Sequence, residues 1–329
     1  MHVRGTGSYV PEAVLSSEAL EARLGLEAGW IHRRTGIRER RAASPSEAVS
    51  DLAVRAGDAA LRNARIERSQ VRLVVLATST PDHLLPATAP AVATRLGISA
   101  PAFDLAAACS GFLYGLALGT RWLTPPQVAP GEAVLVIGAN VLTRRINWSD
   151  GSTAPLFGDG AGAVILTSEP AGVVGGVRGI DLHSDGNYWS DILIPAGGSR
   201  QPISADAIQR GDNLMVMPDG RGLFRRAVRA LAASANRALE NAGLTVRDID
   251  WFVPHQGGRR IVEQAAIELG LSQDHIVSNL ARYGNTSSAS IPLALDEAVQ
   301  DGRITPGSIV LLSAAGAGLT SAAAVIQWS

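Results

Sequence analysis

Residues 48–66, AVSDLAVRAGDAALRNARI, and residues 71–78, VRLVVLAT, decide the fold of this chain. In the first segment apolar residues recur at the spacing of one helix face, whereas in the second they form an almost continuous run. A continuous apolar run is typical of a strand in a sheet that is covered on both faces. The pair therefore predicts a helix packed on a buried strand, the unit of an α/β layered fold.

The same pattern recurs along the chain. Further buried strands are predicted at residues 133–139, 162–167, 250–254 and 308–313. Further helices are predicted at residues 87–96, 111–123, 223–242, 261–269 and 291–299. Because each half carries a comparable succession, we predict two related α/β halves, residues 1–170 and 171–329. Residues 173–221 are rich in Gly, Asp, Ser and Pro and predict a loop-rich insertion, with strand-like segments at 192–194 and 214–217.

The composition limits the classes of function. Of 329 residues, 46% are hydrophobic and 18% charged, against about 25% charged in an average protein, so a large core is expected. The net charge of −1 argues against a broad nucleic-acid or membrane-surface contact. Lysine is absent, so all 29 positive charges are arginines, which bind phosphate groups well. A single cysteine excludes an intramolecular disulfide and a cysteine-based zinc cluster.

The beginning of the chain and its hydropathy predict a cytoplasmic protein. Residues 1–5, MHVRG, lack the basic-then-apolar layout of a signal peptide. We find no run of 18 apolar residues, so no membrane-spanning helix is expected. We expect no metal site and no resident cofactor.

The sharpest local sequence surrounds the one cysteine, in residues 103–112, FDLAAACSGF. A short strand is followed by small residues, then Cys109, then the helix predicted from residue 111. A helix N-terminus stabilises a thiolate, so this position predicts a nucleophile with a lowered pKa. On this segment alone, Cys109 could equally be a small buried apolar residue.

Two other segments carry polar groups in suitable places. His255 directly follows the apolar strand at residues 250–254, where α/β sheets usually hold functional groups. Asn285 lies in the turn YGNTSSAS, residues 283–290, before an apolar helix. Taken singly, the histidine is a structural residue about as often as a functional one, and the asparagine is an ordinary turn residue.

Together these segments resemble the β-ketoacyl-ACP synthase III family. The resemblance covers nearly the whole chain. It rests on residues 5–11 (GTGSYVP), 29–40 (GWIHRRTGIRER), the Cys109 segment, 157–163 (FGDGAGA), 254–256 (PHQ), 284–287 (GNTS) and 316–320 (GAGLT). It implies a thiolase-like fold of two pseudo-duplicated α/β halves in an α-β-α-β-α arrangement.

The resemblance also implies roles for particular residues. Cys109 is expected to take an acyl group from a CoA thioester, a reaction that needs a soft nucleophile. His255 and Asn285 are expected to support decarboxylation of malonyl-ACP by donating to the enolate oxygen. The backbone N–H of Cys109 and an N–H of residues 316–318, where Gly318 lies, are expected to bind the oxyanion of acyl transfer.

The expected partners follow from the same resemblance. Trp30 and Arg34 match residues that hold the adenine and phosphates of CoA. Arg225 and Arg260 match basic residues facing the phosphopantetheine and the carrier protein, although a solvated helix face would also explain them. The substrates are then acyl-CoA and malonyl-acyl carrier protein. The family forms homodimers, in which the loop at residues 83–86 reaches the pocket of the partner.

The sequence departs from the family pattern at four places. Gly257-Gly258 stands where Ala-Asn is usual, Gly151 where an arginine is usual, and Ile267-Glu268 where a basic pair is frequent. Ala315 replaces an aromatic residue that crowds the malonyl carboxylate, so the pocket is expected to be wider.

These departures leave several functions open. One is a specialised synthase that condenses glutaryl-CoA with malonyl-ACP for the pimeloyl part of biotin. Arg144 and Arg145 would then meet the free carboxylate of the starter, unless they are surface residues. Another is a secondary-metabolite acyltransferase. A non-catalytic thiolase-fold partner would be expected to lose Cys109, and a degradative thiolase needs a second cysteine. The glycine runs only weakly suggest a dinucleotide-binding oxidoreductase.

Overall fold

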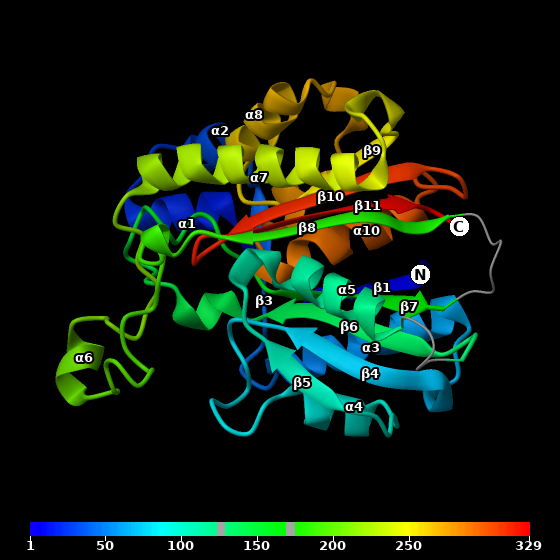
Figure 1. Ribbon diagram of the computed structural model, residues 1–329. Helices are drawn as coiled ribbons and strands as arrows, with labels where there is room; N and C mark the ends of the chain where they lie inside the picture. Colours follow the sequence, from blue (N-terminus) through cyan, green and yellow to red (C-terminus); the bar gives the residue numbers. More distant parts are fainter. Residues whose placement is uncertain (124–128, 169–174) are drawn as a thin grey trace.

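The computed structural model describes residues 1–123, 129–168 and 175–329, and in it two sheets lie one above the other with helices between and outside them (Figure 1). The first sheet has the order β1-β7-β6-β4-β5 and the second the order β8-β11-β10-β9. The strands of the first sheet are β1 (His2–Tyr9), β4 (Val71–Ala77), β5 (Ala102–Leu105), β6 (Ala133–Asn140) and β7 (Gly160–Thr167). Those of the second are β8 (Gly176–Ser184), β9 (Trp251–Pro254), β10 (Ile309–Gly316) and β11 (Thr320–Gln327). A separate hairpin pairs β2 (Ala13–Ser16) with β3 (Glu39–Ala42).

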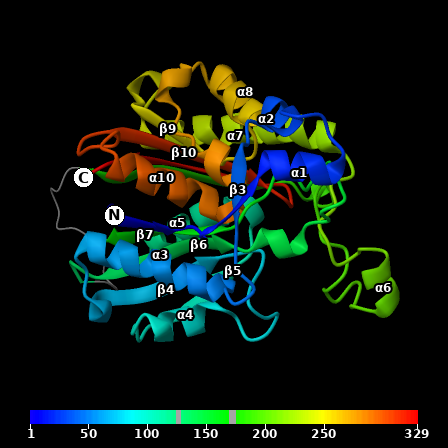
Figure 2. The same ribbon diagram turned by 180° about the vertical axis from the view of Figure 1, so that it is seen from behind.

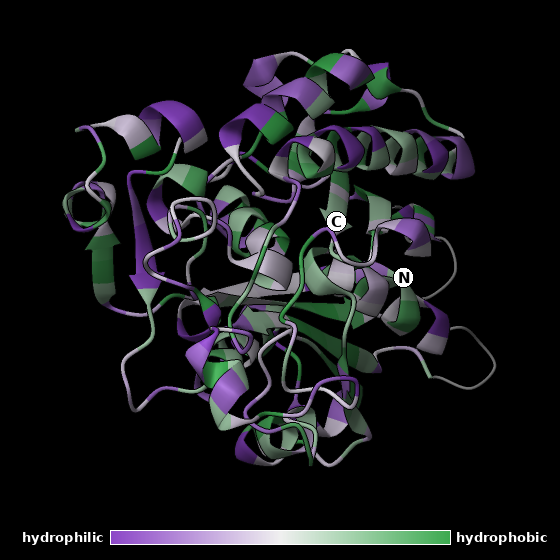
Figure 3. Ribbon diagram, turned by 90° about the vertical axis from the view of Figure 1, so that its left-hand side faces the viewer, coloured by the Kyte–Doolittle hydropathy of each residue, from purple (hydrophilic) through white to green (hydrophobic). Residues whose placement is uncertain are grey.

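The helices complete an α-β-α-β-α arrangement. Helices α3 and α4 cover the outer face of the first sheet, α5 and α10 lie between the sheets, and α7 and α8 cover the second sheet (Figures 1 and 2). The helices are α1 (Ser17–Leu24), α2 (Trp30–Thr35), α3 (Val49–Ala64), α4 (Ala89–Arg95), α5 (Gly111–Trp122), α6 (Ala205–Gln209), α7 (Gly220–Ala242), α8 (Arg259–Leu269), α9 (Leu280–Tyr283) and α10 (Ser290–Gln300). This confirms the predicted fold class. Figure 3 shows the strands in the middle of the molecule mainly in apolar colours, whereas the outer helices alternate between polar and apolar.

Burial explains why the continuous apolar runs form strands. Every residue of β6 and β7 is buried, because helices cover both faces of the first sheet. Helix α3 instead presents one apolar face, which includes Leu52, Ala56 and Ala60, to β1, β7 and β6. The strands and helices predicted outside residues 173–221 are all present, with ends shifted by a few residues.

Two predictions for the second half need comment. The segments at 192–194 and 214–217 contribute only an isolated bridge between Leu193 and Val216, so the strand-like expectation there is wrong. The predicted boundary between residues 170 and 171 lies outside the described residues. Strand β7, in the first sheet, ends before this boundary, and strand β8, in the second sheet, begins after it.

Parallel pairing brings the functional ends of the strands together. Strand β4 pairs in parallel with β5 and β6, and β9 pairs in parallel with β10, so their carboxyl ends lie at one end of the molecule, on the left of Figure 1. Cys109 follows β5 and His255 follows β9. The fold therefore directs residues from both halves to the same place.

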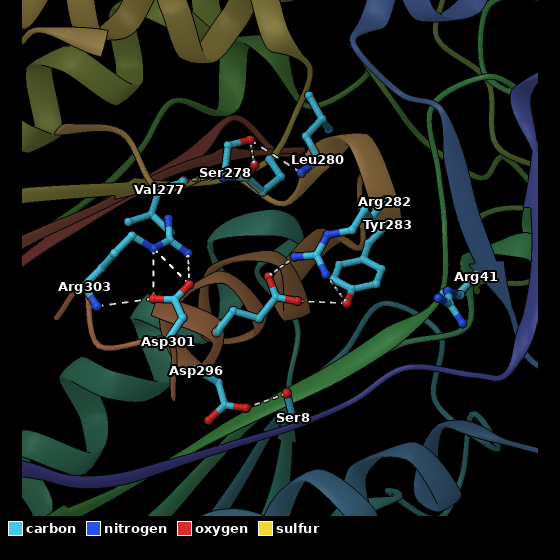
Figure 4. Close-up of polar contacts among 12 residues, drawn as sticks. Ser8, Arg41, Val277, Ser278, Leu280, Arg282, Tyr283, Asp296, Asp301 and Arg303 are labelled. Carbon is cyan, nitrogen blue, oxygen red and sulfur yellow. Dashed lines mark hydrogen bonds and ion pairs between the residues drawn. The ribbon is translucent and has the colours of Figure 1, made fainter. Parts of the chain in front are cut away.

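The central helix α10 also ties the two halves together. The carboxylate of Asp296 accepts hydrogen bonds from the hydroxyls of Thr6 (2.6 Å) and Ser8 (2.5 Å), both on β1. Figure 4 shows Asp296 pointing to Ser8, with Asp301 bound to Arg303 at the end of the same helix. Since Asp296 is buried, these hydroxyls replace the water that the carboxylate loses.

Candidate active site

A cavity of about 770 Å³ opens at the carboxyl ends of the strands. Its walls contain residues from both halves, including Cys109, His255 and Asn285. The expected CoA and carrier-protein residues Trp30, Arg34, Arg225 and Arg260 also line it. Among the described residues, none of those lining the cavity is an aspartate or a glutamate, so its charged groups are all basic.

Cys109 lies in a 3₁₀ turn, Ala108–Ser110, that leads directly into α5. The predicted position at a helix N-terminus is confirmed. Contacts with the second half hold the turn: Ser110 Oγ donates to the carbonyl of Thr320 (3.1 Å), and Thr320 Oγ1 donates to that of Ala107 (3.1 Å). Ala108 has φ 45°, a left-handed conformation that is costly for a non-glycine residue and that the surrounding contacts have to hold in place.

The predicted lowering of the Cys109 pKa is wrong for this structure. Burial raises the pKa of the thiol to about 11, and the Ser287 hydroxyl, 3.5 Å from Sγ, only partly offsets this. Desolvation disfavours the thiolate more strongly than the Ser287 hydroxyl and the backbone N–H of Cys109 favour it. Burial thus favours the protonated thiol, whose proton has to leave as the sulfur attacks.

The backbone N–H of Cys109 lies against the glycine-rich segment that follows β10. A Cβ atom on Gly316 would be only 2.7 Å from the Cys109 nitrogen, so this close approach requires glycine. Gly316 and Ala317 line the cavity. Gly318 lies in the turn between β10 and β11, with φ 125°, and is not among the lining residues.

His255 is buried just beyond β9, and its backbone N–H donates to the carbonyl of Ser313 on β10 (2.8 Å). Its Nδ1 lies 2.7 Å from Ser290 Oγ. A Cβ on Gly257 would be about 3.4 Å from His255 Nε2, so the glycine leaves space beside that edge of the ring. Burial lowers the pKa of His255 to about 4, and the imidazole is therefore neutral at physiological pH.

Asn285 is held by its backbone and by its side chain. Its N–H donates to the carbonyl of Leu156 (2.8 Å), and its carbonyl accepts from Gly158 N–H (3.1 Å). The side-chain Oδ1 accepts from Ser287 N–H (2.8 Å), which identifies the oxygen and leaves the Nδ2 amide group as a donor. Neutral donors on His255 and Asn285 suit an oxygen on which negative charge develops.

Two serines near the site were not singled out from the sequence. Ser287 contacts the sulfur of Cys109, and Ser290 contacts the ring of His255. Both belong to the segment TSSAS that follows Asn285. A run of hydroxyl residues before an apolar helix also suits a helix cap, so sequence alone does not distinguish these roles.

The mouth of the cavity is basic and partly aromatic. Arg34 Cζ lies 5.5 Å from the centre of the Trp30 ring, and Arg260 Cζ lies 5.9 Å from that of Phe224. In the described part of the chain, Arg34, Arg225 and Arg260 form no ion pair with a carboxylate. Exposed arginines without a carboxylate partner are available to phosphate groups.

The departures from the family pattern have structural counterparts. Gly258 has φ 148°, which asparagine could adopt only with strain. A Cβ on Gly151, also on the cavity wall, would meet open space. Ala315 lines the cavity and packs with Leu231 and Ala227. Its small side chain stands where the family has an aromatic ring. Ile267 is 61% exposed on α8.

Arg144 and Arg145 do not line the cavity, and their expected meeting with a starter carboxylate is not supported. Both are exposed, in the 3₁₀ turn Leu142–Arg145 that follows β6. The guanidinium of Arg144 donates to the carbonyls of Ser44 (2.7 Å) and Glu47 (2.5 Å). These contacts hold it at the surface.

Within residues 1–123, 129–168 and 175–329, no group of three or more His, Cys, Asp or Glu side chains is arranged to hold a metal ion. None of the helices in those ranges combines the length and the apolar character that crossing a membrane requires.

Comparison with known proteins identifies the family. The models of the 3-oxoacyl-[acyl-carrier-protein] synthase III family match residues 103–186 and, for its C-terminal part, residues 239–328. A 3-oxopimeloyl-[acyl-carrier-protein] synthase of Rhodothermus marinus is 51% identical over 99% of this chain and 93% of its own. A β-ketoacyl-[acyl-carrier-protein] synthase III of Caldanaerobacter subterraneus is 43% identical over 99% and 97%.

Solved structures agree with the sequence relatives. The crystal structure of β-ketoacyl-[acyl-carrier-protein] synthase III from Thermus thermophilus superimposes with a TM-score of 0.89 at 41% identity, covering 100% of this chain and 99% of the other. The corresponding enzyme of Pseudomonas aeruginosa gives 0.88 at 40%, covering 99% and 98%. The chain therefore belongs to the 3-oxoacyl-[acyl-carrier-protein] synthase III family and is an acyltransferase with the thiolase fold.

Proposed function

We propose that this enzyme condenses an acyl-CoA starter with malonyl-acyl carrier protein through an acyl group carried on Cys109. One observation supports this above all others: a single cavity is lined by the only thiol of the chain together with His255 and Asn285, two side chains that can donate hydrogen bonds while neutral. The proposal assigns the nucleophile to the first half of the molecule and the donors for decarboxylation to the second.

In the first step the sulfur of Cys109 attacks the carbonyl carbon of the acyl-CoA. The carbon–sulfur bond to CoA breaks, and the thiol proton of Cys109 ends on the released CoA. The oxyanion that forms during attack would be stabilised by the backbone N–H of Cys109, which lies against Gly316, and by an N–H of the following segment.

In the second step malonyl-acyl carrier protein enters the same cavity. The bond between its α-carbon and the carboxylate breaks, CO₂ leaves, and the electron pair forms an enolate. Donation from His255 and Asn285 Nδ2 would stabilise the enolate oxygen. The enolate carbon then attacks the acyl carbon on Cys109, and the sulfur leaves as a thiolate that takes up a proton from water.

The basic cavity mouth would bind the phosphates of both substrates. Arg34, next to Trp30, is proposed to hold the nucleotide part of CoA, and Arg225 and Arg260 the phosphopantetheine and its carrier. Neither step requires a resident cofactor. We also propose a cytoplasmic location for the enzyme.

The starter unit decides between two candidate pathways. Initiation of fatty-acid synthesis uses a short monocarboxylic acyl-CoA. The 51% identity with a 3-oxopimeloyl-[acyl-carrier-protein] synthase, against 43% with a β-ketoacyl-[acyl-carrier-protein] synthase III, favours a dicarboxylic starter such as glutaryl-CoA as the second candidate. A dicarboxylic starter needs a partner for its distal carboxylate.

A panel of starters tests the proposal. Acetyl-, branched-chain, medium-chain and glutaryl-CoA are each incubated with the enzyme and malonyl-acyl carrier protein, and the products are identified by mass. A 3-oxoacyl carrier protein from at least one starter is expected. Transfer of the starter to other acceptors without loss of CO₂ would replace this proposal with a simple acyltransferase.

A homodimer is proposed from the exposed apolar residues. Phe103 lies on the free edge of β5, and Leu118 and Trp122 are exposed on α5. Leu84 and Leu85, in the loop expected to enter the pocket of the partner, are more than 80% exposed. Sedimentation equilibrium should give twice the chain mass, and Leu118→Asp with Trp122→Asp should shift the protein toward monomer.

A further inference from the structure

Ser290 is the one side chain of the described residues that contacts a ring nitrogen of His255. It is the first residue of α10 and is only 1% exposed. Its Oγ lies 2.7 Å from His255 Nδ1. The partner at Nδ1 matters because a neutral imidazole carries one N–H, which can be on either nitrogen.

The surroundings of Ser290 Oγ decide which group donates. The backbone N–H of Gln256 points at the same oxygen, at 3.4 Å. Ser290 Oγ therefore already accepts a hydrogen bond, and its own proton needs an acceptor. Within the described ranges no other acceptor contacts this hydroxyl, so Nδ1 is the group left to receive it.

We propose that Ser290 is a positioning residue that donates to His255 Nδ1 and thereby keeps the ring proton on Nε2. A nitrogen that accepts a hydrogen bond is unprotonated, so the single proton of the neutral ring lies on the opposite nitrogen. Nε2 is the atom beside Gly257, on the edge of the ring that has space. The ring is neutral because burial lowers the His255 pKa to about 4.

This tautomer makes His255 a donor rather than an acceptor. An Nε2–H can donate to an enolate oxygen, whereas the other tautomer would present a lone pair and repel it. A further contact holds the neighbouring Gln256: its Nε2 donates to the carbonyl of Pro254 (2.7 Å). Ser290 thus acts on the reaction only through the histidine, and this consequence rests on the proposed decarboxylation.

The resting tautomer is measured without any substrate. The protein is labelled with ¹⁵N histidine, and the signals of His255 are assigned by their absence in His255→Ala. At neutral pH the directly bonded proton is expected on Nε2 in the wild type, and Nδ1 should give the signal of an unprotonated nitrogen. A proton on Nδ1 would overturn the proposal, whatever the activity of the enzyme.

Substitutions then separate positioning from a merely structural role. In Ser290→Ala the two tautomers should mix, and condensation should fall about tenfold, while self-acylation of Cys109 stays within about twofold, because acylation does not use His255. Ser290→Thr keeps the hydroxyl and should restore the spectrum and most of the condensation. Ser234→Ala is the matched control. It removes another buried hydroxyl, which contacts Asp181 and Ser321 instead, and should change neither measurement.

The outcomes keep the two proposals apart. Unchanged ¹⁵N signals or undiminished condensation in Ser290→Ala would refute the positioning role. If the wild type condenses no starter, the proposed function fails, but the wild-type spectrum still tests the tautomer. If Ser290→Thr does not fold, the wild-type and Ser290→Ala spectra decide.

Discussion

The two halves of the molecule build similar sheets but use their strand ends differently. In the first half β4 pairs with a full strand, β5, and Cys109 follows it within a tight turn. In the second half the equivalent neighbour of β9 is reduced to a single parallel bridge between Phe252 and Ile276, and Asn285 follows nine residues later. In the second half, the single bridge and the connection that follows it bring Asn285 to the same cavity as His255. In the first half, the full strand β5 and the turn before α5 place Cys109 alone.

Both halves hold their key residue in its neutral form. Burial raises the pKa of Cys109 to about 11 and lowers that of His255 to about 4. A thiolate–imidazolium pair would instead require a lowered pKa of Cys109 and a raised pKa of His255. Burial thus favours a neutral thiol and a neutral imidazole, which suits the proposed division of labour, with acyl transfer in the first half and decarboxylation in the second.

The largest effect is expected from the first half. Cys109→Ala should abolish formation of the acyl-enzyme, because the chain contains no other thiol. Intact-protein mass spectrometry after incubation with acyl-CoA checks this, since the wild type should gain one acyl mass. Persistent covalent acylation of the variant would remove Cys109 from its role.

The reactivity of the thiol should reveal its raised pKa. Alkylation by iodoacetamide depends on the thiolate, so its rate should rise about tenfold per pH unit and continue to rise well above pH 8.5. The rate is measured between pH 6 and 10.5, with free cysteine as the reference. A plateau near neutral pH would show a stabilised thiolate and contradict the effect of burial.

The second half should affect only the later step. His255→Ala and Asn285→Ala should lower condensation about 10²-fold or more, the cost of a lost oxyanion donor, while measurable self-acylation remains. Single-turnover acylation and product formation are followed separately. If both variants condense normally, the division between the halves is wrong.

A smaller effect is expected at the cavity mouth. Arg34→Ala should raise the KM for acyl-CoA about tenfold and leave kcat nearly unchanged. The reason is that the arginine would bind the CoA phosphate equally well in the ground state and in the transition state. Arg33→Ala is the matched control. Arg33 lies next to Arg34 but pairs with Glu27 (3.0 Å) and does not line the cavity, so its KM should stay within twofold.

The smallest effect is expected from the arginines after β6. Arg144→Ala and Arg145→Ala should each leave the ratio of glutaryl-CoA to acetyl-CoA use within about twofold, because neither lines the cavity. The ratio is measured with both starters under identical conditions. A loss of about 10²-fold on glutaryl-CoA alone would restore these arginines as partners of a starter carboxylate.

Some strands were not predictable from local patterns. Strand β11, TSAAAVIQ, is rich in alanine, which by itself favours a helix. It forms a strand because it pairs with both β10 and β8 in the middle of the second sheet. Strand β1 likewise depends on pairing with β7, which lies more than 150 residues away in the chain. Local propensity is overridden where long-range pairing and burial are available.

The amino-acid sequence by itself determined the layered α/β fold, because apolar periodicity is a local property, and its resemblance to the synthase family singled out Cys109, His255 and Asn285 as candidate site residues. Only the tertiary structure decided the protonation states of the site, the contact of Ser290 with His255 and the surface position of Arg144. These depend on desolvation and on hydrogen bonds between segments far apart in the chain, and neither exists until the two halves pack together.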